Sequence, residues 1–217
     1  MASPARAHAA HEERLRLCDT LERVGPDAPT LCSPWKTRDL AAHLAWREGR
    51  FDLSPVRLAS LVRGRASMSA YAAVEWRSLV ARVRSGPPPV SAFALPGVDA
   101  FANSGEFFIH HEDVLRATPG WDVRPLPPEL EQALWKQLGL AARLRLRSAP
   151  VGIQMVAPGF EPKLVKGATN RGTVTVKGKP GELLLYASGR QRVAVVELDG
   201  REDAAAALAH FAAADRK

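Results

Sequence analysis

The sequence predicts an α+β protein in which an N-terminal helical bundle precedes a smaller unit of mixed helices and strands. Apolar residues make up 46% of the 217 residues and charged residues 24%, a composition that supports a packed core. Helical periodicity dominates the first part of the chain, whereas segments with strand composition occur only after Pro150. We therefore expect one domain over residues 1–149, with a linker helix at 128–147, and a second domain over residues 150–217.

Each helix expected in the N-terminal part ends close to a glycine or a proline. Leu17, Leu21 and Val24 repeat at helical spacing and are followed by Gly25-Pro26. Thr37 is expected to be the N-cap of the next helix. The remaining helices are expected over about 38–51, 69–84, 98–117 and 128–147.

The C-terminal part is expected to alternate between strands and helices. Turn residues separate three segments with strand composition, 151–156, 173–176 and 192–198. Residues 182–188 fit either a short helix or a buried strand, and the flanking Pro-Gly and Gly189 favour the helix. The Ala-rich stretch 201–214 is expected to form the last helix.

Charge and hydropathy exclude or disfavour two classes of partner. The chain has 30 basic and 23 acidic residues, so its net charge of +7 makes nucleic acid a partner to consider. The basic residues are spread along the chain without a basic arm, which disfavours DNA or RNA binding. No stretch reaches the roughly 18 to 20 apolar residues that span a bilayer. The N-terminus also lacks the apolar core of a signal peptide, so we expect a cytoplasmic protein with no membrane partner.

A stripe of polar residues runs along the helix expected at 98–117. Each residue turns the helix by about 100°, so four polar side chains lie within about 60° of Glu106 around the helix axis. They are Asp99, Asn103, His110 and Asp113. Glu106 and His110 are four residues apart, so both can reach one metal ion. A Glu–His hydrogen bond on a solvated face is the alternative.

His43 is the third candidate metal ligand. Leu40 and Leu44 place it beside the apolar face of its helix, where a histidine can also serve a purely structural role. Helical bundles build metal sites from side chains on facing helices. Two imidazoles and the carboxylate of Glu106 suit zinc and leave one coordination position open, as in catalytic sites.

The remaining polar residues are expected to have lesser roles. Asp113, three residues after His110, can accept the second N–H of that imidazole. His111 is rotated by about 100° from His110 and is expected to pack or to lie at an interface. Cys18 and Cys32 are too few for a disulfide framework and lack metal-ligand spacing, and neither is our candidate for a nucleophile.

Three segments resemble a known family. Residues 33–44, SPWKTRDLAAHL, and 106–114, EFFIHHEDV, resemble the mycothiol-dependent maleylpyruvate isomerase family within the DinB-like group of metal-binding proteins. Within that group the likeness is greatest to a subgroup described only as metal-binding. Residues 181–190, GELLLYASGR, resemble a Leu-rich stretch of the family's C-terminal domain. The resemblance implies a DinB-like four-helix bundle followed by a small sterol-carrier-protein-like α+β domain.

Carried over by position, the resemblance implies that His43, Glu106 and His110 bind a divalent metal, most often Zn²⁺. It implies that mycothiol reaches the open coordination position, and that Arg190 matches an arginine that the isomerases need for activity. An exposed surface arginine is the alternative for Arg190.

We therefore expect a metal-dependent enzyme that acts on a small electrophilic substrate with a low-molecular-weight thiol such as mycothiol. The reaction is expected to be an isomerisation of the maleylpyruvate type or a thiol S-transfer. A non-catalytic metal- or ligand-binding protein is the first alternative, and a nucleic-acid-associated basic protein is the second. The sequence leaves the substrate and the oligomeric state open.

Overall fold

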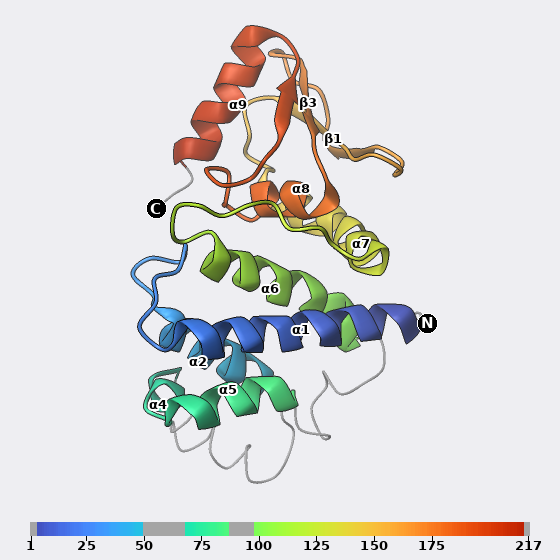
Figure 1. Cartoon of the computed structure of the whole chain (residues 1–217). Helices are drawn as coiled ribbons and strands as arrows, with labels where there is room; N and C mark the ends of the chain where they lie inside the picture. Colours follow the sequence, from blue (N-terminus) through green and yellow to red (C-terminus); the bar gives the residue numbers. More distant parts are fainter. Residues whose placement is uncertain (1–3, 50–67, 87–97, 215–217) are drawn as a thin grey trace, which may run out of the picture. The chain divides into compact units, whose positions relative to one another are not determined.

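The computed structural model describes residues 4–49, 68–86 and 98–214, and Figure 1 draws the helices and strands of these ranges. Within these ranges the chain forms eight helices and one four-stranded sheet, which confirms the mixture of helices and strands predicted from the sequence. The chain divides into two compact units, Met1–Asp122 and Val123–Lys217. This division differs from the expected one at residue 149, because the helix over 128–145 belongs to the second unit.

The first unit is helical. Its described helices are α1 (Pro4–Val24), α2 (Thr37–Gly49), α4 (Met68–Ala72), α5 (Trp76–Ser85) and α6 (Val98–Leu115). Helix α1 packs along α6 and also contacts α5, while α2 packs against α4 and α5 (Figure 1). Their shared core is a cluster of buried apolar side chains that includes Leu17, Leu21, Leu40, Leu44, Leu79, Val83 and Phe107. This packing fixes α2 and α6, the two helices on which the candidate ligands lie.

Two details of the first unit differ from the sequence prediction. The single helix expected over 69–84 is interrupted, because the carboxylate of Glu75 caps α5 by accepting from the N–H groups of Arg77 and Ser78 at 2.9 and 2.8 Å. Thr37 is the first residue of α2 and not a side-chain N-cap. Its hydroxyl donates to the carbonyl of Gly25 at 2.5 Å, which attaches the start of α2 to the end of α1.

The second unit is a sheet with helices packed against it. Helix α7 (Pro128–Arg145) precedes the strands β1 (Gly152–Val156), β2 (Lys163–Lys166) and β3 (Thr173–Lys177); α8 (Pro180–Ala187), β4 (Glu197–Asp199) and α9 (Glu202–Ala214) follow. The strand order is β2-β1-β3-β4, in which β1 and β3 are parallel and both outer pairs are antiparallel. Helix α7 contacts α8 and β2, and α9 contacts β3.

The sequence predicted most elements of the second unit, with two errors. Residues 182–188 are helical within α8, as expected. The strand expected over 192–198 is reduced to β4, because the N–H groups of Val193 and Ala194 both donate to the carbonyl of Arg190 and form a turn. Strand β2 was missed, since its sequence Lys-Leu-Val-Lys has only two apolar residues between two charged ones.

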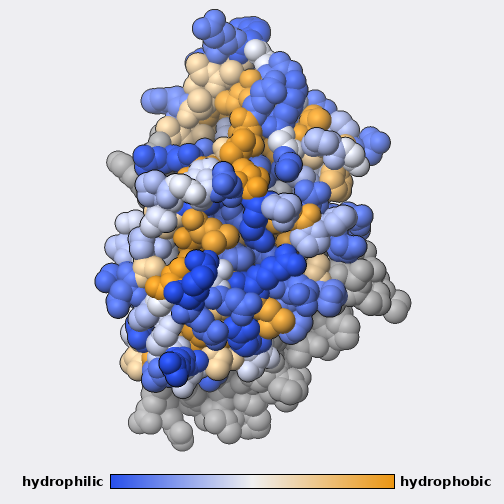
Figure 2. All heavy atoms as spheres, in the orientation of Figure 1, coloured by the Kyte–Doolittle hydropathy of each residue, from blue (hydrophilic) through white to orange (hydrophobic). Residues whose placement is uncertain are grey.

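Most of the face drawn in Figure 2 is hydrophilic, and its hydrophobic side chains lie in several separate groups. Among the described residues, the large apolar side chains that are most exposed are Leu140, Leu144, Leu164 and Val195. No helix within the described ranges is both long enough and apolar enough to cross a membrane.

Replacing Gly152 by alanine should destabilise the second unit. A Cβ atom there would lie 2.6 Å from Thr173 Oγ1, 2.8 Å from the Cα of Ala168 and 2.9 Å from the carbonyl oxygen of Gly167. Because two of these neighbours are backbone atoms, the start of β1 must shift, and we expect a loss of about 1–3 kcal/mol in the free energy of unfolding. Urea denaturation measures this loss. Gly167→Ala is the matched control, since nothing lies within 4 Å of its Cβ position, and an equal loss in both variants would contradict the steric explanation.

Candidate metal centre

The structure brings together the three residues that the sequence predicted as metal ligands. His43 lies on α2, and Glu106 and His110 lie one turn apart on α6. One carboxylate oxygen, Glu106 Oε1, is 3.1 Å from His43 Nε2 and 3.3 Å from His110 Nε2. All three potential ligand atoms lie within 4.8 Å of one another.

The donor atoms and their spacing fit a zinc ion. Zinc bonds of about 2.0–2.1 Å in tetrahedral geometry place neighbouring ligand atoms roughly 3.3 Å apart. The two contacts of Glu106 Oε1, at 3.1 and 3.3 Å, are close to this separation. Two imidazoles and one carboxylate are also a ligand set that zinc accepts while keeping a further coordination position open.

Differences in exposure show on which side the centre opens. The side chain of Asp113 is fully buried and that of His110 is 10% exposed, so these two residues form the inner side. The side chains of His43 and Glu106 are 22% and 25% exposed and form the outer side. His43 and Glu106 are therefore the more exposed of the three candidate ligands.

Charged neighbours keep Glu106 ionised. Burial of its carboxyl group opposes ionisation, but hydrogen bonds with His110 and His43 and the nearby charge of Arg47 outweigh burial and hold the pKa of Glu106 well below its usual range. Arg47 Nε lies 3.5 Å from Glu106 Oε1, and the same guanidinium donates to Asn103 Oδ1. Glu106 is thus in the form that binds a metal.

The pKa of His110 is shifted in the opposite direction to that of Glu106. Burial lowers its pKa, but hydrogen bonds with Asp113, Cys32 and Glu106 outweigh burial and raise the pKa well above its usual value. A metal ion that binds at His110 Nε2 must therefore displace a proton.

A second group of possible ligands meets the other nitrogen of the same imidazole. Asp113 Oδ2 lies 2.9 Å from His110 Nδ1, and it accepts a hydrogen bond from Cys32 Sγ at 3.0 Å. These separations are shorter than those around a metal whose bond to sulfur is about 2.3 Å long, and they suit hydrogen bonds better. Asp113 therefore occupies the position that the sequence predicted for it, where it orients the ring of His110 so that Nε2 faces Glu106.

Three residues near the centre were not identified from the sequence. Cys32 and Trp35 belong to the loop that joins α1 to α2, and the ring of Trp35 lies 5.2 Å from that of His43. The N–H of Leu31 donates to the carbonyl of Asp113 at 2.9 Å and attaches this loop to α6. Arg47, the third, follows His43 by one helical turn, a spacing that could have indicated it.

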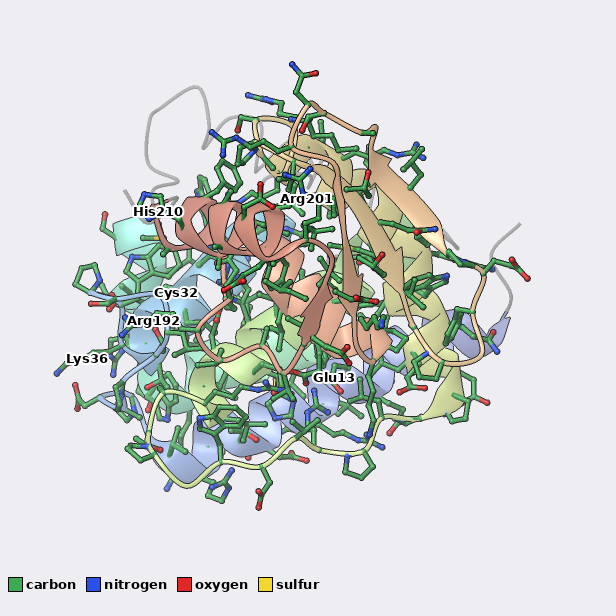
Figure 3. All side chains as sticks on the ribbon, turned by 90° about the horizontal axis from the view of Figure 1, so that it is seen from above. Glu13, Cys32, Lys36, Arg192, Arg201 and His210 are labelled. Carbon is green, nitrogen blue, oxygen red and sulfur yellow. The ribbon has the colours of Figure 1, made fainter. Side chains whose placement is uncertain are left out.

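His111 lies outside the centre. Its Nδ1 is 2.8 Å from Glu13 Oε1 and its Nε2 is 2.9 Å from Thr20 Oγ1, so it connects α6 to α1, where Glu13 is labelled in Figure 3. His111 is buried, which agrees with packing, one of the two roles that the sequence left open for it. The side chain of Asp99 lies outside the described part of the structure.

Arg190 belongs to the second unit, just after α8. Its Nη1 donates to the carbonyl of Ser188 at 2.6 Å, and its side chain is partly buried. Its role in substrate binding stays a prediction.

The fold and this donor set define an α+β protein with a candidate two-histidine, one-glutamate metal centre in its helical unit. Solved structures similar to the chain include that of the mycothiol-dependent maleylpyruvate isomerase and that of a histidine-to-alanine mutant of this enzyme. In each case the TM-score is 0.53 at 14% sequence identity, and the match covers 91% of this chain and 93% of the other. No family model and no curated protein matches the sequence. The similarity establishes a shared fold, which agrees with the predicted family resemblance and leaves the subgroup a prediction.

Proposed function

We propose that the protein is a metal-dependent enzyme that isomerises a small electrophilic substrate with the help of a low-molecular-weight thiol such as mycothiol. The observation that carries this proposal is the convergence of His43, Glu106 and His110, on a fold shared with a mycothiol-dependent isomerase. Zn²⁺ is the proposed metal, since it suits imidazole and carboxylate ligands and needs no redox partner. Thiol S-transfer to an electrophile is the second reaction class that the same centre would serve.

Four residues of the first unit have distinct roles in this proposal. His43, Glu106 and His110 would hold the ion, and Asp113 would keep the imidazole of His110 in the required orientation by accepting its second N–H. A bound zinc ion would favour the thiolate form of a thiol, which is otherwise mostly protonated at neutral pH.

The cysteines of the chain are poor candidates for this nucleophile. Burial raises the pKa of Cys18 to about 12, so its thiol stays protonated. Cys32 donates its hydrogen to Asp113 and lies on the side of His110 away from Glu106. An exogenous thiol is therefore the better nucleophile, in line with the sequence prediction.

The proposal is tested by assaying isomerisation of maleylpyruvate with the purified protein. We expect turnover only when mycothiol and a divalent metal are both present, loss of turnover after chelation, and recovery on adding Zn²⁺. A panel of other electrophiles with mycothiol tests S-transfer. If the protein binds Zn²⁺ stoichiometrically and turns over neither maleylpyruvate nor any electrophile of the panel, it is a non-catalytic metal-binding protein.

Arg190→Ala should lower thiol-dependent turnover by about one order of magnitude or more, because a charged contact that orients the substrate is lost. Zinc content should stay unchanged, since all three proposed ligands lie in the first unit. Arg190→Lys should restore only part of the activity, because an ammonium group cannot form the two parallel hydrogen bonds of a guanidinium. Arg192→Ala, at an exposed arginine two residues further on, is the control. Equal effects at both positions would remove Arg190 from the proposed site.

A further inference from the structure

Three of the most exposed large apolar side chains lie on two neighbouring elements of the second unit. Leu140 and Leu144 are one turn apart on α7, and Leu164 lies on β2; they are 59%, 58% and 58% exposed. Arg143 Nη2 donates to the carbonyl of Leu164 at 3.3 Å, so β2 runs beside this face of α7. Soluble proteins seldom gather exposed leucines in this way, and such a group marks a contact surface.

Basic side chains accompany the leucines on α7. Lys136 and Arg143 lie within about 60° of Leu140 around the helix axis, and Arg147 follows in the turn after the helix. All three basic side chains are exposed. The outer face of α7 is therefore both apolar and positively charged, whereas its inner face packs in the core.

Strand β2 adds two further positive charges. Lys163 Nζ is 3.8 Å from the position of a Cβ atom on Gly139, so this ammonium group lies against the outer half of α7. Lys166 Nζ donates to the carbonyl of Ala149, just beyond the end of α7. Both lysines keep part of their side chains exposed to solvent.

Carboxylates do not compensate these charges. Residues 132–166 contain six basic residues and a single acidic one, Glu161. Among the described residues, no carboxylate forms an ion pair with the five basic side chains of this surface; these are Lys136, Arg143, Arg147, Lys163 and Lys166. An anionic partner would supply the missing negative charge.

The residue types fit an anionic membrane surface better than a protein or a nucleic acid. Leucine side chains enter the boundary between headgroups and acyl chains, while lysine and arginine side chains contact lipid phosphates. Protein interfaces are depleted in lysine and depend on aromatic anchors, and single-stranded nucleic acids stack on aromatic rings. The ring of Trp135, which Lys163 covers, is buried and serves neither purpose.

We propose that the outer face of α7 and the strand β2 bind the anionic phospholipid surface of a membrane. This contact needs no helix that crosses the bilayer. It differs from the expectation of no membrane partner, which considered only spanning segments and a signal peptide. It is also independent of the metal centre, whose candidate ligands lie in the first unit.

The test is co-sedimentation of the whole chain with vesicles made of equal parts of phosphatidylglycerol and phosphatidylcholine. We expect the wild type to bind these vesicles, and to bind vesicles of pure phosphatidylcholine about 10-fold or more weakly. Raising the NaCl concentration from about 0.05 to about 0.5 M should weaken binding to the anionic vesicles, because salt screens the attraction.

Lys136→Gln combined with Arg147→Gln should weaken binding to the anionic vesicles by about 10- to 30-fold, since each basic residue near such a surface contributes a factor of about five. Arg16→Gln combined with Arg77→Gln is the matched control, because it changes the net charge equally at two exposed arginines of the first unit. The control should stay within about 2-fold of the wild type.

Leu140→Gln combined with Leu144→Gln tests the apolar part of the surface and keeps good helix formers in α7. It should weaken binding by about 10-fold or more, because two side chains no longer enter the lipid boundary. Val195→Gln, at another exposed apolar residue of the same unit, should bind like the wild type.

Three results would overturn the proposal. The wild type may bind neither kind of vesicle. The paired control may lose as much binding as Lys136→Gln with Arg147→Gln, in which case binding follows net charge and not this surface. Fluorescence anisotropy may show that a labelled DNA duplex binds more tightly than the vesicles and that the same pair of substitutions removes this binding, which would make the surface a nucleic-acid site. Circular dichroism checks folding, and the basic pair and the leucine pair each test the surface separately.

Discussion

His43→Ala is expected to lower the affinity of the protein for Zn²⁺ by about 100-fold or more, because two protein ligands seldom hold zinc tightly. Glu106→Ala should have a comparable effect, and the double variant should bind no zinc at micromolar concentration. Competition with a chelating indicator measures the affinity, and elemental analysis gives the stoichiometry. His11→Ala, at an exposed histidine of α1, controls for loss of a histidine as such. One zinc ion per chain in the double variant would show that the metal is bound elsewhere.

Two groups of possible ligands contain His110, one with His43 and Glu106 and the other with Cys32 and Asp113. Two further variants test which group binds the metal. Asp113→Asn should lower zinc affinity by about 10- to 100-fold, as is typical when the partner of a ligating histidine is changed. Cys32→Ser should have little effect if the thiol only donates to Asp113, as the 3.0 Å contact indicates. A loss in Cys32→Ser as large as that in His43→Ala would instead assign the metal to Cys32, His110 and Asp113.

The residues of the site that could be predicted most directly from the sequence are those that lie together on one helix, α6. Glu106, His110 and Asp113 lie on consecutive turns of α6, so the geometry of the helix alone brings them to one face. His43 is 63 residues from Glu106, and linking it to the pair required the general rule that bundles build metal sites between facing helices. Cys32 is 81 residues from Asp113 and lies in a loop. A loop has no periodicity from which the direction of a side chain could be predicted.

The division into units could not be read from the sequence for a related reason. A proline-rich stretch before α7 and another proline after it mark two equally plausible boundaries. Helix α7 joins the second unit because it packs against α8, which begins 35 residues after α7 ends (residue 180 less residue 145). Periodicity predicts that α7 has a buried face, including Leu130, Leu134 and Leu138, but it does not identify the partner.

The largest effect on stability is expected at a buried ion pair that joins α1 to α2. Arg14 Nη2 and Nη1 donate to the two carboxylate oxygens of Glu48 at 2.6 and 2.9 Å, and the two side chains are only 3% and 5% exposed. Arg14 also donates to the carbonyl of Val83 at 2.9 Å, and its guanidinium lies over the ring of Phe107. The charge of Arg14 is therefore held in the core, where it depends on the carboxylate of Glu48 for compensation.

Glu48→Ala should lower the free energy of unfolding by about 3–5 kcal/mol, because the guanidinium stays buried after its carboxylate is removed. The double variant Arg14→Met, Glu48→Leu should recover most of this loss, since it removes both charges and keeps apolar volume in the core. Urea denaturation measures both, and Asp27→Ala, which breaks the exposed pair with Lys36, should leave the midpoint unchanged. If Glu48→Ala were as stable as the wild type, water or another group would have to compensate Arg14. Because Glu48 lies on the same helix, α2, as the proposed ligand His43, Glu48→Ala should also weaken zinc binding, whereas the double variant, which restores the packing of α1 on α2, should restore it.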